Sequence, residues 1–228
     1  MTDAADLFDD RAQADTYADR VAQMVPAYRD VHRMAGVLID EYAARDARIL
    51  VLGAGGGLET KAFAETHPEW TFEAVDPAAA MLDLATKTLG PLASRVRMHH
   101  GYIDSASRGP FAAATSLLTL HFLEPELRRH TAAEVRQRLA PGAPFVVMHL
   151  SIPARDDAER ASWLRRHAAN LVAAGIEPEA AEQACATITD QVSVLTPEQD
   201  RAVLEDAGFT EVTEFFSAFT FRGWVGYA

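Results

Sequence analysis

The stretch that decides the fold is Ile49–Thr60, ILVLGAGGGLET. An unbroken apolar run, Ile49–Leu52, leads directly into a loop rich in glycine, and a helical pattern follows the loop. The glycines are Gly53, Gly55, Gly56 and Gly57. A short apolar run bounded by glycines is typical of a strand buried on both faces of a parallel sheet. Glycines let the backbone approach a ligand, and the next helix directs free N–H groups to the same place. The stretch therefore predicts a nucleotide-type site.

The spacing of these glycines is Gly-x-Gly-x-Gly, whereas the dinucleotide fingerprint would need a glycine where Leu58 stands. A second apolar strand, Thr71–Asp76, ends in a carboxylate that can accept hydrogen bonds from both hydroxyls of a ribose. With these features the chain resembles the class I S-adenosylmethionine-dependent methyltransferases, whose first strand ends in this glycine pattern and whose second ends in a ribose-binding acid. The later segment 139–147, LAPGAPFVV, strengthens the resemblance.

The resemblance implies an α/β, Rossmann-like fold, with a seven-stranded, mostly parallel sheet, helices on both faces and a helical lid. We expect a single methyltransferase domain over residues 1–228, because no linker, repeat or low-complexity tract interrupts the chain. A chain of this size can bury roughly 70% of its unfolded surface. Residues 1–46 are expected to form N-terminal cap helices, and residues 153–192 a helical lid inserted after the fifth strand.

The expected cofactor is S-adenosyl-L-methionine. By resemblance, the loop residues and the acid of the second strand would bind it, and further contacts would come from the segments around them. The cofactor-binding candidates are Gly53, Ala54, Gly55, Gly57, Asp76, Pro77, Met81, Tyr102, Ile103, Leu118 and Tyr28. Tyr102 stands where many relatives carry an acid for the adenine amine, so backbone groups of Tyr102 and Ile103, or the nearby Asp104, are the alternatives there. Tyr17 and Arg20 are further candidates near the methionine end.

Two histidines are the candidate catalytic residues. His121 follows the fourth predicted strand and His149 ends the fifth, so both are expected at the edge of the sheet where ligands bind. Either could take a proton from a hydroxyl or amine that is being methylated. In-line methyl transfer needs alignment more than an acid or base, so the alternative is that neither acts. No metal site is expected, because the adjacent His99 and His100 face opposite sides of a strand.

A helix is predicted from Pro125 to about Leu139, with Leu127 among its inward residues. Its four arginines are Arg128, Arg129, Arg136 and Arg138. We interpret them as a solvated basic face, the alternative being a phosphate site.

The amino-acid composition limits the classes of partner that the protein is expected to bind. The net charge is −12, from 33 acidic against 21 basic residues, and this repels polyanions, so a nucleic-acid partner is not expected. A small-molecule acceptor, neutral or cationic and partly apolar, is expected instead, and a homodimer is left open. The single cysteine, Cys185, excludes an internal disulfide and suits a cytoplasmic location. The N-terminus, MTDAADLFDDRAQ, lacks a signal pattern, and no apolar run approaches the ~20 residues of a membrane span, so no membrane partner is expected.

Within the methyltransferases, the chain is most similar to the carboxy-S-adenosylmethionine synthase branch. The shared segments are 25–34 (VPAYRDVHRM), the glycine loop, 118–128 (LTLHFLEPELR) with 139–147, and the ending that begins at Leu204. Enzymes of that branch make a carboxylated cofactor used on a tRNA wobble uridine, and an arginine in the last insert helix is thought to hold the extra carboxylate. The matching stretch here, 180–192 (AAEQACATITDQV), contains no basic residue. We therefore expect ordinary S-adenosylmethionine and a different substrate.

Two other functions stay open on the sequence. A nicotinamide-dependent oxidoreductase is disfavoured by Leu58 and by the helical segment ahead of the first strand. A non-catalytic cofactor-binding protein is the other alternative, because methyl transfer has no obligatory catalytic residue.

Overall fold

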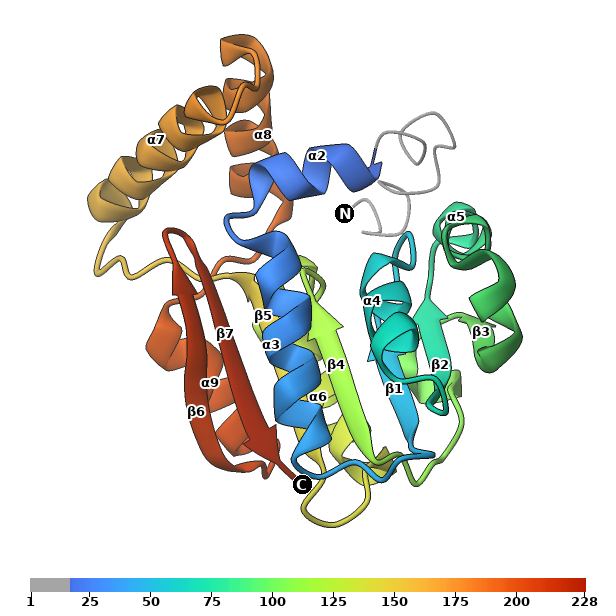
Figure 1. Ribbon diagram of the computed structural model, residues 1–228. Coiled ribbons are helices and arrows are strands. Elements are labelled where there is room, and N and C mark those ends of the chain that lie inside the picture. The colour runs from blue at the N-terminus through green and yellow to red at the C-terminus, as the bar shows by residue number, and fades with distance from the viewer. Residues whose placement is uncertain (1–16) are drawn as a thin grey trace.

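The computed structural model describes residues 17–228, with the side chains of residues 20–228 (Figure 1). The part of the predicted cap that falls on residues 1–16, and the side chain of Tyr17, lie outside the described residues. No helix within the described range is long and apolar enough to cross a membrane.

Seven strands form one sheet in the order β3-β2-β1-β4-β5-β7-β6. Strands β1 to β5 are parallel, and β7 and β6 add to β5 as an antiparallel pair, as predicted. The bounds are β1 Arg48–Leu52, β2 Thr71–Asp76, β3 Val96–His100, β4 Ala113–Leu117, β5 Pro144–Leu150, β6 Thr210–Ala218 and β7 Phe221–Tyr227. The order reverses between β1 and β4, so the loops after these two strands meet at a topological switch point, where open α/β sheets bind ligands.

Helices cover both faces of the sheet, as Figure 1 shows. The bounds are α2 Tyr17–Met24, α3 Tyr28–Asp40, α4 Leu58–Thr66, α5 Ala79–Leu89, α6 Pro125–Arg138, α7 Asp157–Ala173, α8 Pro178–Gln191 and α9 Pro197–Asp206. Short 3-10 turns are η2 Gly90–Arg95, η3 Ile103–Ser105 and η4 Leu120–Phe122. The fold class predicted from the sequence is confirmed.

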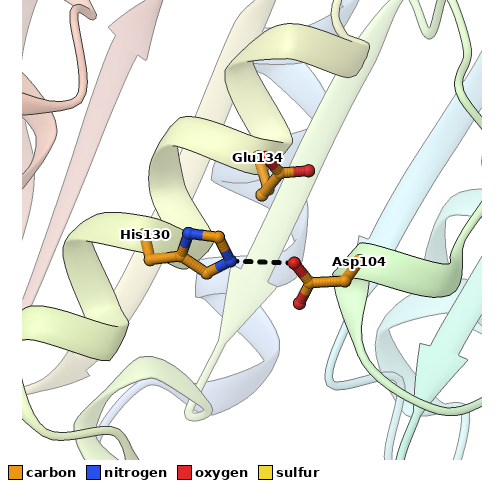
Figure 2. A group of neighbouring side chains, drawn as sticks. All are labelled: Asp104, His130 and Glu134. Carbon is orange, nitrogen blue, oxygen red and sulfur yellow. Dashed lines mark hydrogen bonds and ion pairs between the residues drawn. The ribbon is translucent and has the colours of Figure 1, made fainter.

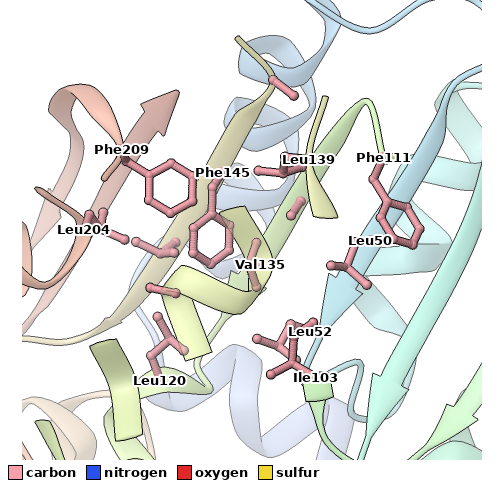
Figure 3. Packing of buried hydrophobic residues seen from close by; sticks show 14 of the residues in the cluster. Leu50, Leu52, Ile103, Phe111, Leu120, Val135, Leu139, Phe145, Leu204 and Phe209 are labelled. Atoms are coloured by element: carbon pink, nitrogen blue, oxygen red, sulfur yellow. The ribbon is translucent and has the colours of Figure 1, made fainter. Parts of the chain in front are cut away.

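The core divides at the sheet because successive strand side chains point to opposite faces. On β1, Ile49 and Val51 pack with residues of α3 and α4, whereas Leu50 and Leu52 pack with residues of α6 and α9. Figure 3 shows the second of these layers, in which Val135 of α6 lies among Leu50, Phe145 and Phe209. Complete burial of β1 on both faces explains its unbroken apolar sequence.

The lid and cap lie at the carboxyl edge of the parallel strands. Helices α7 and α8 form a hairpin between β5 and α9, and α2 lies across the same edge of the sheet (Figure 1). A third apolar cluster joins these parts, since Val21 and Val25 of the cap pack with Ile188 of α8 and with Leu117 and Met148 at the strand ends. The predicted lid therefore covers the edge at which ligands bind.

Some local predictions were wrong. Proline is favoured in the first turn of a helix, which predicts that the helix after the second strand starts at Pro77, but α5 starts at Ala79 and its N-cap is Ala78. Leu127 is 48% exposed rather than inward. Of the four arginines of α6, Arg128 and Arg138 are buried, so they do not form a solvated face.

Candidate functional site

The glycine loop has a backbone that only glycine adopts without strain. Gly53, Gly55 and Gly57 have φ angles of 72°, 49° and 79°, in the left-handed region. A Cβ on Gly53 would lie 2.0 Å from Oγ1 of Thr119, in the loop that follows β4. The loops after β1 and β4 are therefore in direct contact, and no side chain fits at Gly53. Gly57 caps α4, whose first N–H groups point to this place.

Asp76 lies next to the glycine loop. It ends β2 and is 7% exposed, with Oδ2 accepting from the N–H of Gly55 at 2.8 Å and Oδ1 from the N–H of Ala78 at 2.9 Å. A carboxylate oxygen has two lone pairs, so each oxygen can accept a further hydrogen bond beside the one from the backbone. The Asp76 carboxylate lies next to the glycine loop, where a Cβ would fill the space that a ligand needs. This arrangement fits the ribose of S-adenosylmethionine. Ala54 is buried beside it and donates its N–H to Val75.

The segment expected near the adenine follows β3. The Tyr102 side chain is 47% exposed, and Ile103 is buried under η3. Asp104 pairs with Nε2 of His130 at 2.8 Å, as Figure 2 shows. Glu134 lies within 4.8 Å of both residues, so these three could ligate a metal ion. Glu134 is paired with Arg138 at 2.6 Å, however, so two ion pairs account for the cluster without one.

A cavity of about 270 Å³ opens beside the cofactor site, under the cap and the lid. It is lined from the cofactor side by Met81 and Leu118, and from the lid by α8 residues that include Thr187 and Ile188. Leu118 has a φ of 60°, which is uncommon for a residue with a side chain and typical of functional sites. Leu118 precedes Thr119, whose side chain lies against Gly53, so the cavity adjoins the glycine loop. Contact of Met81 and Leu118 with the cofactor stays a prediction.

His121 lines this cavity and has a defined tautomer. Its Nδ1 accepts a hydrogen bond from the backbone N–H of Leu150 at 3.0 Å. An amide N–H can only donate, so Nδ1 presents its lone pair and Nε2 carries the proton of the neutral ring. Burial, followed by the charges of His149 and Arg128, holds the pKa of His121 well below its ordinary value of 6.5. His121 is therefore a neutral N–H donor, which is the wrong form for a general base.

His149 is not among the described residues that line the cavity. It is 2% exposed, and its Nε2 lies 3.0 Å from Oδ1 of Asp200, with the Trp224 ring 5.6 Å away between centroids. Burial alone would raise the pKa of Asp200, but the charge and contact of His149 and the charge of Arg128 lower it. His149 thus faces a buried carboxylate rather than the cavity, and a catalytic role for it stays a prediction.

Arg128 connects these groups to the end of the lid. Its Nη1 donates to Oδ1 of Asp200 at 2.6 Å, and its Nη2 donates to the carbonyl oxygens of Leu123 and Ser193. Ser193, which follows α8, in turn donates its N–H to the carbonyl of His121. The buried arginine therefore fixes the loop that carries His121 against the segment that leaves the lid.

His167 of α7 also lines the cavity and was not among the predicted catalytic residues. It is 1% exposed, and its Nδ1 lies 2.8 Å from Oγ1 of Thr220. Burial lowers its pKa from 6.5 to about 4, so its ring is neutral at physiological pH. The sequence indicates His167, on the inserted helix, as a residue that could line the substrate pocket, and the structure places it there.

The remaining predicted residues have these places. The Pro77 carbonyl accepts a hydrogen bond from Nε2 of His100 at 2.9 Å, beside the cofactor site. Tyr28 is buried in α3 against the ring of His32, 4.5 Å between centroids, and is not among the described cavity residues. Contact of Tyr28, Tyr102, Ile103 and Pro77 with the cofactor stays a prediction.

Residues 49–142, which include the glycine loop, Asp76 and Leu118, match the family model described as a methyltransferase domain. This is a class I methyltransferase domain. The segment that carries the site thus matches a methyltransferase domain, and the sheet order, the glycine loop and Asp76 fit S-adenosylmethionine as its cofactor.

Sequence relatives cover nearly the whole chain. The carboxy-S-adenosyl-L-methionine synthase of Chromohalobacter salexigens is 26% identical over 224 residues, covering 96% of this chain and 82% of the relative. The synthase of Dichelobacter nodosus is 25% identical, and the match covers 96% of this chain and 90% of that relative. The predicted similarity to this branch is thus confirmed.

Solved structures show the same fold. An O-methyltransferase family protein from Burkholderia thailandensis superposes with a TM-score of 0.69 at 15% identity, over 96% of this chain and 60% of that protein. Human N-acetylserotonin methyltransferase, in complex with S-adenosylmethionine, superposes with a TM-score of 0.59 at 14% identity. The match covers 95% of this chain and 57% of that protein. This chain thus spans somewhat more than half the length of these two structures.

Proposed function

We propose that the protein transfers the methyl group of S-adenosylmethionine to a small, largely apolar molecule held in the cavity under the lid. The observation that carries this proposal is the cavity itself, which is lined by Met81 and Leu118 beside the glycine loop and by residues of α2 and α8. A substrate held there would meet the cofactor at the edge of β4. No residue beyond those that bind and align the two molecules is required for such a transfer.

The volume of the cavity limits the size of the substrate. A protein cavity of about 150 Å³ accommodates benzene, so about 270 Å³ suits a molecule of one or two rings or a comparable aliphatic skeleton. Most of its lining is apolar, with Val21, Val25, Leu150 and Phe221 among the wall residues.

The residues of this chain hold the substrate and the cofactor in position and surround them with an apolar wall. When bound, S-adenosylmethionine supplies a methyl group on a sulfonium, which an electron-rich atom can attack in line. The lid and cap surround the cavity with mostly apolar side chains, and polar contacts are stronger in such low-dielectric surroundings than in water. His121 holds an N–H in a fixed orientation there. The geometry does not favour His121 or His149 as the base, so the substrate would react in a form that needs no buried base.

Synthesis of a carboxylated cofactor is the second candidate, and two observations favour it. The sequence relatives bear the name of that synthase, and Arg20 of α2 lines the cavity. Against it, the α8 residues of the cavity wall are Ala184, Thr187 and Ile188, and no lysine or arginine lies between Arg166 and Arg201. An arginine is the natural partner of a carboxylate through paired, charge-assisted bonds. We therefore rank methyl transfer first.

Transfer of a labelled methyl group tests the proposal. The purified protein is incubated with methyl-deuterated S-adenosylmethionine and a small-molecule extract, and products are sought by mass. We expect a product below the size limit of the cavity that carries the label. Consumption of the cofactor only when a small carboxylic acid or tRNA is added, with no labelled small molecule, would contradict it.

A further inference from the structure

The polar groups of the cavity suggest which substrates it takes. Apolar side chains make up most of the wall, and the polar or charged side chains among the described lining residues are Arg20, His121, His167 and Thr187. No aspartate or glutamate of residues 20–228 lines it. A cavity without a carboxylate offers a substrate cation no charged partner, and desolvating such a cation would be unfavourable.

His121 provides the best defined of these groups. The ring is 5% exposed, its Nδ1 is held by the Leu150 N–H, and no residue in the described part of the chain accepts a hydrogen bond from its Nε2. The Nε2 atom is not among the fully buried, unpaired side-chain atoms of the described residues, so it is accessible from the cavity that His121 lines. An oxygen of a ligand held there can accept its hydrogen bond.

Arg20 adds a positive charge to the same cavity. It lies on α2, is exposed, and forms no ion pair or hydrogen bond with any other described residue. Its guanidinium cannot be deprotonated under physiological conditions, so it favours an anion over a neutral molecule of the same shape. The local field here is thus opposite in sign to the net charge of −12, from which a neutral or cationic substrate was expected.

We infer that the substrate is a small apolar molecule carrying an acidic or carbonyl oxygen, such as a carboxylate or phenolate, which accepts a hydrogen bond from Nε2 of His121 and lies within the field of Arg20. This inference rests on the proposed function, because it concerns the same cavity. It makes His121 a positioning residue and a donor rather than a base. It also selects against amines of the same size.

The test compares three probes of similar size with the protein saturated with S-adenosylhomocysteine. Benzoate, toluene and benzylammonium are titrated and their binding is followed by NMR. We expect benzoate to bind at least about tenfold more tightly than toluene, the scale of a hydrogen bond to a charged group, and benzylammonium to bind most weakly. Benzylammonium binding as tightly as benzoate would overturn the inference. Because binding of S-adenosylhomocysteine is measured first, failure of the proposed function is seen separately.

Two substitutions separate the roles of the His121 ring. In His121→Asn, the amide oxygen can still accept from the Leu150 N–H, but the donor at the position of Nε2 is lost. The preference for benzoate over toluene should then fall about tenfold with little change in melting temperature. In His121→Gln, an N–H donor is regained at longer reach, so part of the preference should return, although the Leu150 N–H loses its partner. A preference unchanged in His121→Asn would refute the assignment.

Arg20→Gln should weaken the binding of benzoate about fivefold and leave the binding of toluene unchanged. Its control is Arg129→Gln, because Arg129 is a surface arginine whose ion pair, with Asp206, is exposed. An equal loss in both variants would mean that only the net charge matters, and would remove Arg20 from the inference.

Discussion

Arg128 of α6 and Asp200 of α9 form an ion pair with no solvent exposure of either side chain, at 2.6 Å between Nη1 and Oδ1. The pair joins two helices on one face of the sheet and, through the carbonyl of Ser193, the end of the lid. Taking both charges out of water is costly, so the pair itself adds little net stability, whereas either charge alone would be strongly unfavourable.

The first prediction concerns this pair. Asp200→Ala leaves Arg128 buried without its counter-charge and should lower the free energy of unfolding by about 3–5 kcal/mol. Replacing both residues with apolar ones, as in Arg128→Met with Asp200→Leu, should restore most of that loss. Urea unfolding of the three proteins is the measurement. A double variant less stable than Asp200→Ala would show that the pair is a net source of stability.

The second prediction concerns Glu59, in the first turn of α4. Burial raises its pKa from 4.5 to about 8, with a smaller opposing effect of Thr115, so the folded protein holds it protonated at neutral pH. The folded state then binds one more proton than the unfolded state between about pH 4.5 and 8, and stability falls as pH rises through that window, by up to about 1.4 kcal/mol per pH unit.

Glu59→Gln removes that titration while keeping the shape of the side chain. The variant should match the parent near pH 4 and become progressively more stable than it toward pH 8. The buried histidines add stability as pH rises, which is opposite to the effect of Glu59. Their contribution is the same in variant and parent, so it cancels in the difference. A constant difference in unfolding free energy across the window would show that Glu59 is not protonated in the fold.

The third prediction concerns the glycine loop. Gly53→Ala places a Cβ 2.0 Å from Oγ1 of Thr119, in addition to the strain of a positive φ. Gly142→Ala is the matched control, because Gly142 has a similar φ of 76° and open space around the new Cβ. The control should cost about 1–2 kcal/mol of stability and keep cofactor affinity, whereas Gly53→Ala should abolish binding of S-adenosylhomocysteine in calorimetry. Equal affinities in both variants would place the cofactor elsewhere.

The fourth prediction concerns Asp76. Asp76→Ala should weaken cofactor binding by about 1.5–3 kcal/mol, the scale of hydrogen bonds to a charged group. Asp76→Asn should lose less, although its amide cannot accept from both Gly55 and Ala78 as the carboxylate does. Titration with S-adenosylhomocysteine measures both. Parent-like binding of the alanine variant would mean that this acid does not contact the ribose.

The parts of the site that the sequence predicted are local in the chain. The apolar run before Gly53 and the strand that ends in Asp76 each carry their own signal, because burial and turn geometry act over a few neighbouring residues. The same holds for the capping box at Thr196, because the sequence of residues 196–199, Thr-Pro-Glu-Gln, by itself predicts the start of α9.

The parts that the sequence did not predict depend on long-range packing. Arg128 was interpreted as part of a solvated face because its helix carries four arginines, and its partner Asp200 lies 72 residues away. The tautomer of His121 is set by a backbone amide 29 residues away. No pattern of neighbouring residues encodes these contacts.

Competition between the two cofactors tests the central claim most directly. The protein is offered equal concentrations of S-adenosylmethionine and carboxy-S-adenosylmethionine, and the retained form is identified by native mass spectrometry. The α8 helix carries no cation to form a paired contact with the extra carboxylate, and an exposed arginine such as Arg20 contributes little to an ion pair, so the ordinary cofactor should be retained. Retention of the carboxylated form, with its loss in Arg20→Gln, would contradict the account and make the protein a synthase that holds the carboxylate from α2.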